Sequence, residues 1–234
     1  LFSVSVVSFL FLTSSSASAD TTVSANASVR VAEACTLSSS LDTPHTATVS
    51  PGTYEGNGIG QTTLSVTCND NGGYAIYAVG YTGEKIGDTN STKLVGQTSG
   101  LTISTGTNTS TGDSNWTMKL ATTGTNAPTL DNGYNDFSTV PLTYVKVAHK
   151  DSSTGSTAST ITTTYAAYIS NSQVADTYTG KVKYTLVHPN NETPAQPVAC
   201  TPSRICYQPN ASTVTGQMGS KYATNNASIA LYAP

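Results

Sequence analysis

The sequence predicts an all-β protein, and three observations lead to this fold class. Apolar and polar residues alternate over several segments, which is typical of strands with one buried face. Charged residues make up only 10% of the chain, against roughly 25% in typical soluble domains. Tyr outnumbers Phe by 13 to 4, and Tyr and Thr suit strands that face water on one side.

The start of the chain predicts export. Residues 1–12 are apolar, are too short to span a bilayer, and lead through small residues to Ala17-Ser18-Ala19. We therefore expect a signal peptide over residues 1–19, cleaved near Asp20, with a few residues missing at its start. No later run approaches the ~20 apolar residues of a membrane span. The expected localisation is secreted, at the cell surface, with membrane contact only through the signal peptide or a missing C-terminal anchor.

Residues 22–31 form the first expected strand. Apolar and polar positions alternate there without interruption, which predicts a strand of about ten residues that ends or bulges at Glu33. Cys35 keeps the parity of the apolar face. The apolar positions are Val23, Ala25, Ala27, Val29 and Val31.

Residues 63–81 form the hairpin around which the prediction is organised. Leu64, Val66 and Cys68 share one parity, so Cys68 belongs to the buried face of a strand. The strand after Gly72-Gly73 is apolar on both faces, so we expect either a central strand or a strand whose outer face carries exposed tyrosines. The glycine run at 56–60, between Cys35 and Cys68, is expected to be a turn, because it lacks the residues of a phosphate-binding loop.

Four cysteines in an exported chain predict disulfides, namely Cys35, Cys68, Cys200 and Cys206. Cys35 and Cys68 both follow inward-facing parities, so we expect them to pair. Cys200 and Cys206 are the two that lie nearest in sequence. The chain has neither a C-x-x-C pattern nor a nearby Cys/His cluster, so neither a metal site nor a cofactor is expected.

The rest of the first domain is expected to consist of strands. Trp116 alternates with polar neighbours and is expected in the core. The clearest late strand covers residues 173–188 and is expected to be the last of the domain. The other expected strands are 93–95, 101–104, 115–122, 139–148 and 161–169.

Residues 189–203 contain four prolines and little apolar content, which predicts a semi-rigid linker. We expect a second module to begin near Arg204 and to be cut off at Pro234. The expected organisation is thus a sandwich over 20–188, a linker over 189–203 and a truncated β-module over 204–234.

Candidate chemical sites are few. His45, His149 and His188 belong to no catalytic motif and are expected to be solvated loop or strand-end residues, so no catalytic residue is assigned and the protein is not expected to be an enzyme. Residues 131–136 carry oxygen donors around a glycine, but they lack the spacing of an EF-hand and are expected to be an ordinary turn. The net charge of −3 gives no basic footprint for nucleic acid.

The export signal, the alternating first strand, Cys35 and the strand ending at Cys68 together resemble the bacterial fimbrial pilin and spore coat protein U group. The closing residues 178–187 look like the last strand of such domains. The resemblance implies an immunoglobulin-like β-sandwich with one disulfide between early strands, used as a structural subunit of surface fibres and coats. Residues 82–170 are longer than a compact pilin needs.

Residues 205–219, with Cys206 and Gly216 among them, are similar to the opening of the internalin B-type repeat. That resemblance implies a small β-grasp-like module of bacterial surface proteins, of which only the front half is present.

The sequence thus predicts a non-enzymatic secreted surface protein, either a structural subunit of a fibre or envelope layer or an adhesin domain. Its expected partners are other copies of itself or molecules of host or neighbouring cell surfaces. The alternative is a carbohydrate-binding module, for which tyrosines would have to form an exposed row on one sheet. The candidates for such a row are Tyr74, Tyr77, Tyr81, Tyr165 and Tyr168.

Overall fold

The computed structural model describes residues 31–40, 45–81, 90–107, 110–194 and 222–232. Apart from Val31, these residues belong to one compact unit, Ala32–Pro234. Every regular element in the described part is a strand, and none of it is a helix long and apolar enough to cross a membrane. The predicted all-β fold class is therefore confirmed.

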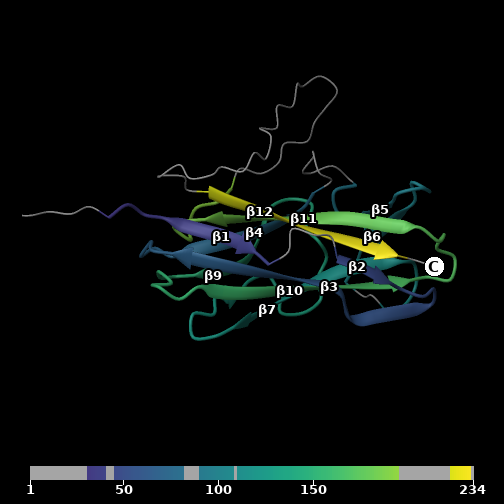
Figure 1. Cartoon of the computed structure of the whole chain (residues 1–234), viewed down its shortest axis with the longest axis horizontal. Coiled ribbons are helices and arrows are strands. Elements are labelled where there is room, and N and C mark those ends of the chain that lie inside the picture. The colour runs from purple at the N-terminus through teal and green to yellow at the C-terminus, as the bar shows by residue number, and fades with distance from the viewer. Residues whose placement is uncertain (1–30, 41–44, 82–89, 108–109, 195–221, 233–234) are drawn as a thin grey trace, which may run out of the picture. The chain divides into compact units, whose positions relative to one another are not determined.

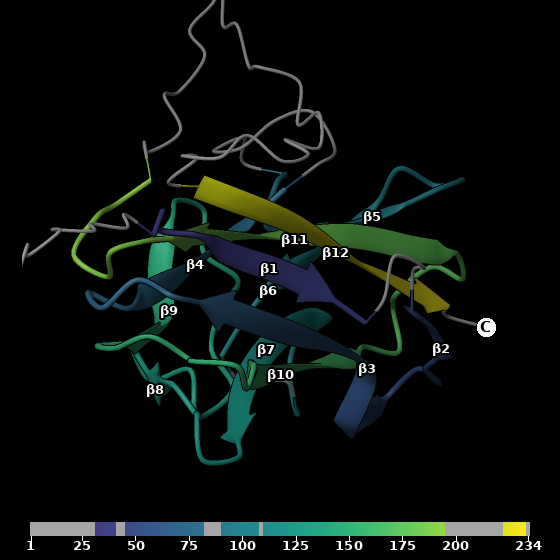
Figure 2. The same cartoon turned by 60° about the vertical axis from the view of Figure 1, so that its left-hand side comes forward.

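The first sheet has the order β1-β3-β10-β7-β6. In its centre β10 pairs antiparallel with β3 on one side and with β7 on the other. β6 pairs in parallel with β7 at the edge. Figure 2 shows β3, β7 and β10 below β11 and β12. The strands are β1 (Cys35–Ser39), β3 (Thr53–Cys68), β10 (Ser159–Ile169), β7 (Asn115–Thr123) and β6 (Thr102–Thr105).

The second sheet has the order β8-β9-β4-β11-β12-β2, with β5 beside the start of β11. β5 also pairs with β6, so the two sheets are joined at this edge. Figure 1 shows β12 in yellow beside β11 in green. The strands are β8 (Thr129–Leu130), β9 (Val145–Lys150), β4 (Tyr74–Gly80), β11 (Thr177–Val187), β5 (Leu94–Gly96), β12 (Tyr222–Tyr232) and β2 (His45–Thr48).

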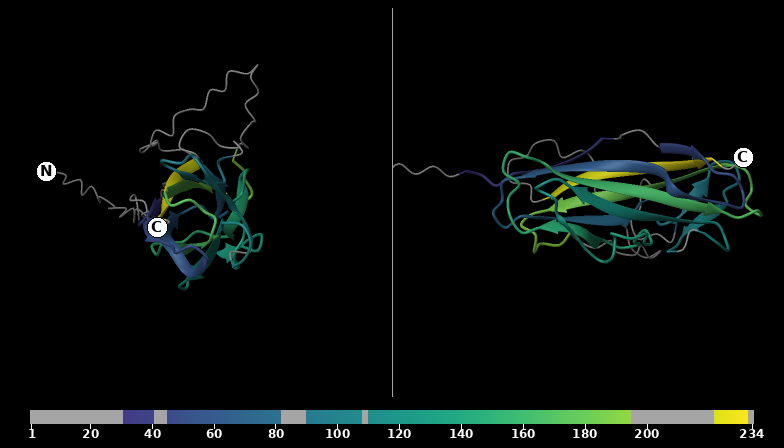
Figure 3. Two further views of the ribbon diagram at one scale, coloured as in Figure 1. Left: turned by 90° about the vertical axis from the view of Figure 1, so that its right-hand side faces the viewer. Right: turned by 90° about the horizontal axis from the view of Figure 1, so that it is seen from below.

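The two sheets enclose one apolar interior (Figure 3, left). β1 pairs with β3 in the first sheet, whereas β2, a few residues later, pairs with β12 in the second, so the chain changes sheet between them. β4 pairs with β11 on one side and β9 on the other, and all seven of its residues are buried. Of the two arrangements that the sequence left open, a central strand or one with exposed tyrosines, the structure shows the central strand.

The glycine run at 56–60 lies inside β3 and is not the turn that the sequence predicted. The pairing of β3 with β10 shifts register there, between Tyr165 and Ala167, which is a bulge. Gly58 has φ +100°, and a Cβ on it would lie 2.7 Å from Cγ2 of Thr164. Glycine is therefore used here to let the two strands approach closely at the bulge that interrupts their ladder.

β1 begins at Cys35, whereas the sequence predicted an earlier strand that ends or bulges at Glu33. Residues 22–30, which carry most of that predicted strand, lie outside the described residues. Cys35 pairs directly with Cys68, and the ladder then runs on to Ser39 opposite Leu64. The parity argument thus identified the correct pair of cysteines from a different strand register.

The core joins the sheets through aromatic side chains. Trp116 is fully buried, as predicted, and its indole N–H donates to the Thr92 carbonyl at 3.0 Å. Its ring centroid lies 6.3 Å from that of Tyr165. The Tyr165 hydroxyl meets that of Tyr184 at 2.9 Å, and Tyr184 donates to Thr163 Oγ1 at 3.1 Å. The polar groups of Trp116, Tyr165 and Tyr184 thus all have hydrogen-bond partners inside the sandwich.

Residues 222–232 form a strand of the sandwich, whereas the sequence assigned them to a separate repeat module. Their alternation suits a half-buried strand of any sheet, and only the pairing with β11 identifies which one. Residues 195–221, which hold most of the expected linker and the rest of the expected module, lie outside the described residues.

Candidate assembly site

A strand from the far end of the chain completes the second sheet. β12 pairs antiparallel with β11 along its whole length, from Tyr222 opposite Val187 to Tyr232 opposite Thr177. On its other edge, residues 229–232 pair in parallel with β2. β12 therefore occupies a strand position between β11 and β2, which we call the β11–β2 site.

The connection into β12 is much longer than its register needs. Because Tyr222 lies opposite Val187, a loop of about two to five residues would join the two strands as a hairpin. The chain instead places the 34 residues 188–221 between them. Pairing in the β11–β2 site is thus not imposed by a tight turn.

β11 presents a buried apolar row to this site. Tyr178, Val182, Tyr184 and Leu186 are fully buried in the core. Residues directly opposite each other in an antiparallel pair share a face of the sheet. An occupant of the site therefore needs small or aliphatic residues at most alternate positions. In β12 these positions hold Ala223, Asn225, Ala227, Ile229 and Leu231.

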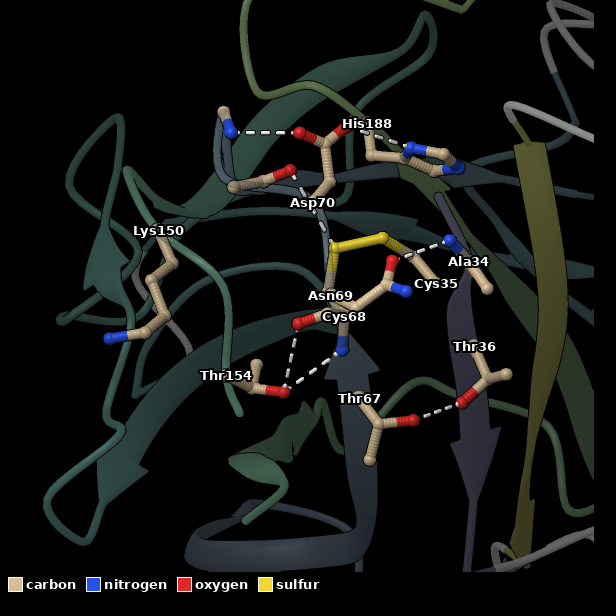
Figure 4. Close-up of a disulfide and its surroundings, with 12 residues drawn as sticks. Ala34, Cys35, Thr36, Thr67, Cys68, Asn69, Asp70, Lys150, Thr154 and His188 are labelled. Atoms are coloured by element: carbon tan, nitrogen blue, oxygen red, sulfur yellow. Dashed lines mark hydrogen bonds and ion pairs between the residues drawn. A yellow bond between two sulfur atoms is a disulfide. The ribbon is translucent and has the colours of Figure 1, made fainter. Parts of the chain in front are cut away.

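The Cys35–Cys68 disulfide fastens the end of the first sheet (Figure 4). It links the first residue of β1 to the last residue of β3, with Cα atoms 4.0 Å apart. Thr154 holds Cys68 from the other side, because its backbone N–H donates to the Cys68 carbonyl at 2.8 Å and its hydroxyl accepts from the Cys68 N–H at 2.9 Å. Cys200 and Cys206 lie outside the described residues.

Asn69 holds the residues that precede β1. Its side-chain amide donates to the Ala32 carbonyl at 2.9 Å, and its Oδ1 accepts from the Ala34 N–H at 2.6 Å. Its own N–H donates to the Ala34 carbonyl at 3.1 Å. Residues 32–34 are therefore fixed beside the turn that follows β3.

His188 is buried and paired, not solvated as the sequence predicted. It is 4% exposed, Asp70 is 6% exposed, and His188 Nδ1 lies 3.1 Å from Asp70 Oδ2. The other oxygen of Asp70 accepts from the Gly72 N–H at 2.7 Å, and the Asn190 N–H donates to the Gly72 carbonyl at 3.1 Å. The turn after β3, and with it residues 32–34, therefore lies at the Val187 end of β11.

His149 is also paired with a carboxylate. Its Nδ1 lies 2.7 Å from Asp131 Oδ2, which commits the first carboxylate of the segment 131–136. Asn132 adopts a left-handed φ of 54° and donates from its side chain to the Lys146 carbonyl at 2.8 Å. The Tyr134 N–H donates to the Asp131 carbonyl at 3.2 Å, so the start of this segment is the turn that the sequence predicted. His45 begins β2, and its side chain is not described.

Three of the tyrosines considered for a sugar-binding row, Tyr74, Tyr77 and Tyr165, are buried. Burial raises the pKa of Tyr74 and of Tyr165 to about 12. Tyr81 and Tyr168 are partly exposed. Tyr168 lies directly opposite Tyr54, which is 38% exposed, so one aromatic pair reaches the surface of the first sheet.

Asp176 fixes the β5–β6 turn at the start of β11. Its carboxylate accepts from the N–H and hydroxyl of Ser99, each at 2.7 Å, and from the Thr98 N–H at 3.0 Å. These bonds, those of Ser99 foremost, lower the pKa of Asp176 to about 2. The carboxylate thus serves a structural purpose.

Sequence reasoning did not single out Asn69, Asp70 or β12. The run Asn69-Asp70-Asn71-Gly72 signals a turn, and that signal suggests side-chain bonds to the local backbone. It does not reveal His188, which is 118 residues away. Nothing in the residues around β12 indicates that β11 is the strand with which it pairs.

No family model and no curated protein matches the chain. One similar solved structure is a family 123 glycoside hydrolase from Clostridium perfringens, with a TM-score of 0.31 and 8% identity. The match covers 87% of this chain and 27% of that one. A second is AvmM, which catalyses macrocyclization in alchivemycin A biosynthesis, with a TM-score of 0.23, 7% identity and coverage of 86% and 89%.

Proposed function

We propose that the protein is a non-enzymatic, secreted structural subunit of a surface fibre or envelope layer, and that its copies join at the β11–β2 site. The observation that carries this proposal is the position of β12. A whole strand of the sandwich is supplied from beyond a connection of 34 residues where a few would suffice. Such a strand can yield the site to an equivalent strand of another copy at little cost in contacts, since similar pairs form in either case.

A second segment of the chain matches the requirements of the site. Residues 24–31 read Ser-Ala-Asn-Ala-Ser-Val-Arg-Val, and residues 224–231 read Thr-Asn-Asn-Ala-Ser-Ile-Ala-Leu. The two share Asn-Ala-Ser in the same place and aliphatic residues two and four positions after Ala. In the register of β12, the N-terminal segment brings only apolar residues to the core side, namely Val23, Ala25, Ala27, Val29 and Val31.

This N-terminal segment cannot reach the site of its own molecule in the direction and register of β12. There, Val31 would lie opposite Tyr178, nine positions along β11 from Val187, or about 30 Å. Ala32, the next residue, is bonded to Asn69 at the Val187 end. One peptide unit spans only about 3.8 Å. The segment therefore fits the site of a neighbouring copy, which makes the contact head-to-tail and open-ended.

The composition suits a structural role outside the cell. The expected signal peptide directs the chain to an oxidising compartment, where the Cys35–Cys68 bridge persists. A fibre subunit needs a durable fold and a strand site, and it needs no reactive cleft.

The test uses the mature chain 20–234, a variant that lacks residues 222–234 and a variant that lacks residues 20–31. We expect the first to form concentration-dependent oligomers in analytical ultracentrifugation and short fibres by negative stain. The second should bind a labelled peptide of residues 21–32 with one-to-one stoichiometry, and a peptide of the same composition in scrambled order should not bind. The third should lose the fibres. A mature chain that stays monomeric at every concentration would contradict the proposal.

The carbohydrate-binding alternative rests on the Tyr54–Tyr168 pair, because neighbouring exposed rings are the surface on which sugars stack. A glycan array with the mature chain and with Tyr54→Ala tests it. Monomers that bind a glycan, and lose it in Tyr54→Ala, would favour this function over the structural one.

A further inference from the structure

Three side chains that can ligate a metal ion meet at the disulfide end of the sandwich. A carboxylate oxygen of Glu33, one of Asp70 and a nitrogen of His188 all lie within 4.8 Å of one another. Among the described residues, these are the three His, Cys, Asp or Glu side chains that lie close enough together to hold one ion. We propose that these three residues form a site for a divalent transition-metal ion of the zinc class.

Two of the three ligands are buried and already oriented. Asp70 and His188 are 6% and 4% exposed, and His188 Nδ1 lies 3.1 Å from Asp70 Oδ2. Ligand atoms about 2.0–2.2 Å from a tetrahedral zinc ion are about 3.3–3.5 Å apart. An ion can therefore lie between these two atoms with almost no movement of either side chain.

Glu33 is the adjustable ligand. Its side chain is exposed, and its backbone is fixed because Asn69 bonds to both neighbours, Ala32 and Ala34. Its carboxylate oxygen lies within 4.8 Å of the other two ligand atoms, and a rotation of this side chain can bring it to the spacing that a tetrahedral ion requires. The three ligands come from three segments, so the ion would tie the residues before β1, the turn after β3 and the end of β11 together.

The charge of the site favours a cation. Two carboxylates lie beside one imidazole, and neither carboxylate has a lysine or arginine partner among the described residues. Lys150 is near, but Figure 4 shows its side chain directed away from Asp70 and His188. Buried carboxylates of this kind are stabilised by pairing or by metal coordination.

The ligand set indicates which ion. A nitrogen with two carboxylate oxygens suits zinc, cobalt or manganese, whereas calcium takes an all-oxygen shell of six to eight ligands. Three protein ligands leave at least one position for water. Protons compete with a metal ion for its ligand atoms, so affinity falls as the pH is lowered.

The test is titration of the oxidised mature chain 20–234 with zinc chloride by calorimetry, and with cobalt chloride by visible absorption. We expect one equivalent to bind at pH 7 and calcium to bind at least about tenfold more weakly. Glu33→Gln should weaken zinc by at least about tenfold, since loss of even an outer-shell partner has that effect. Glu33→His should retain binding, and Glu55→Gln, an exposed carboxylate at the other end of β3, should match the unaltered chain.

The double variant C200S/C206S controls for zinc held by thiols. If this variant binds like the unaltered chain, the site lies at Glu33, Asp70 and His188. Absence of stoichiometric binding, equal affinity in Glu33→Gln, or loss of binding in C200S/C206S would each overturn the proposal.

Discussion

Tyr165 of β10 and Tyr184 of β11 meet across the core with their hydroxyl oxygens 2.9 Å apart. Each belongs to a different sheet, and Tyr184 also donates to Thr163 of the first sheet at 3.1 Å. The pKa of Tyr184 is raised well above its ordinary value, chiefly by burial and further by the neighbouring Tyr165. This polar pair therefore fixes the relative placement of the two sheets inside an otherwise apolar interior.

Tyr184→Phe should lower the free energy of unfolding by about 1–3 kcal/mol. The substitution removes one hydroxyl and leaves those of Tyr165 and Thr163 buried with a lost partner, which is the expensive way to delete a hydrogen bond. Urea unfolding followed by the fluorescence of Trp116 measures the change. Tyr168→Phe, at a partly exposed position, should stay within about 0.5 kcal/mol. Equal effects of the two substitutions would contradict the role given to the buried pair.

Replacing Cys35 and Cys68 together by Ser should cost about 3–4 kcal/mol. The bridge spans 33 positions of sequence, and closing a loop of that length restricts the unfolded chain by this amount in the chain-entropy model. Chemical denaturation with and without reductant checks the value. In the double variant, reductant should have no further effect on the described sandwich, and an unchanged midpoint in that variant would disprove the stabilising role.

Gly58→Ala should destabilise the bulge in β3 more than Gly124→Ala destabilises its loop. Both glycines have positive φ, at +100° and +91°, so both substitutions carry backbone strain of about 1 kcal/mol or more. Only at Gly58 does the new Cβ meet a neighbour, Thr164, at 2.7 Å. Thermal unfolding of the two variants separates strain from overlap, and the prediction fails if Gly124→Ala is the less stable of the two.

Stability should fall in acid as Asp176 becomes protonated. Its pKa is about 2 in the folded protein, lowered chiefly by the hydrogen bonds from Ser99, against an ordinary value of 3.8. A depressed folded pKa contributes stability above the unfolded pKa, and that contribution is lost as the pH falls from about 4 to about 2. Melting temperatures of Asp176→Asn between pH 2 and 6 should show a smaller loss over this interval. Asp113→Asn, at another exposed position, should follow the unaltered chain.

The sequence identified most strands because alternation is a local property. Residues 115–122 and 161–169 lie inside β7 and β10, and Trp116 is buried as its parity indicated. The glycine run in β3 was misjudged, because glycine is a turn signal in isolation and a device for close strand approach in a sheet. His188 was misjudged because its partner Asp70 comes from a distant turn.

The sequence by itself determined the fold class and the parity that pairs Cys35 with Cys68. Each of these follows from side-chain period, which neighbouring residues define. Only the tertiary structure decided that residues 222–232 complete the second sheet beside β11, and that Glu33, Asp70 and His188 converge at one end. The physical reason is that strand pairing and side-chain convergence join segments far apart in the chain. Backbone hydrogen bonds between strands do not depend on the identity of the side chains, so the sequence does not indicate which strands pair.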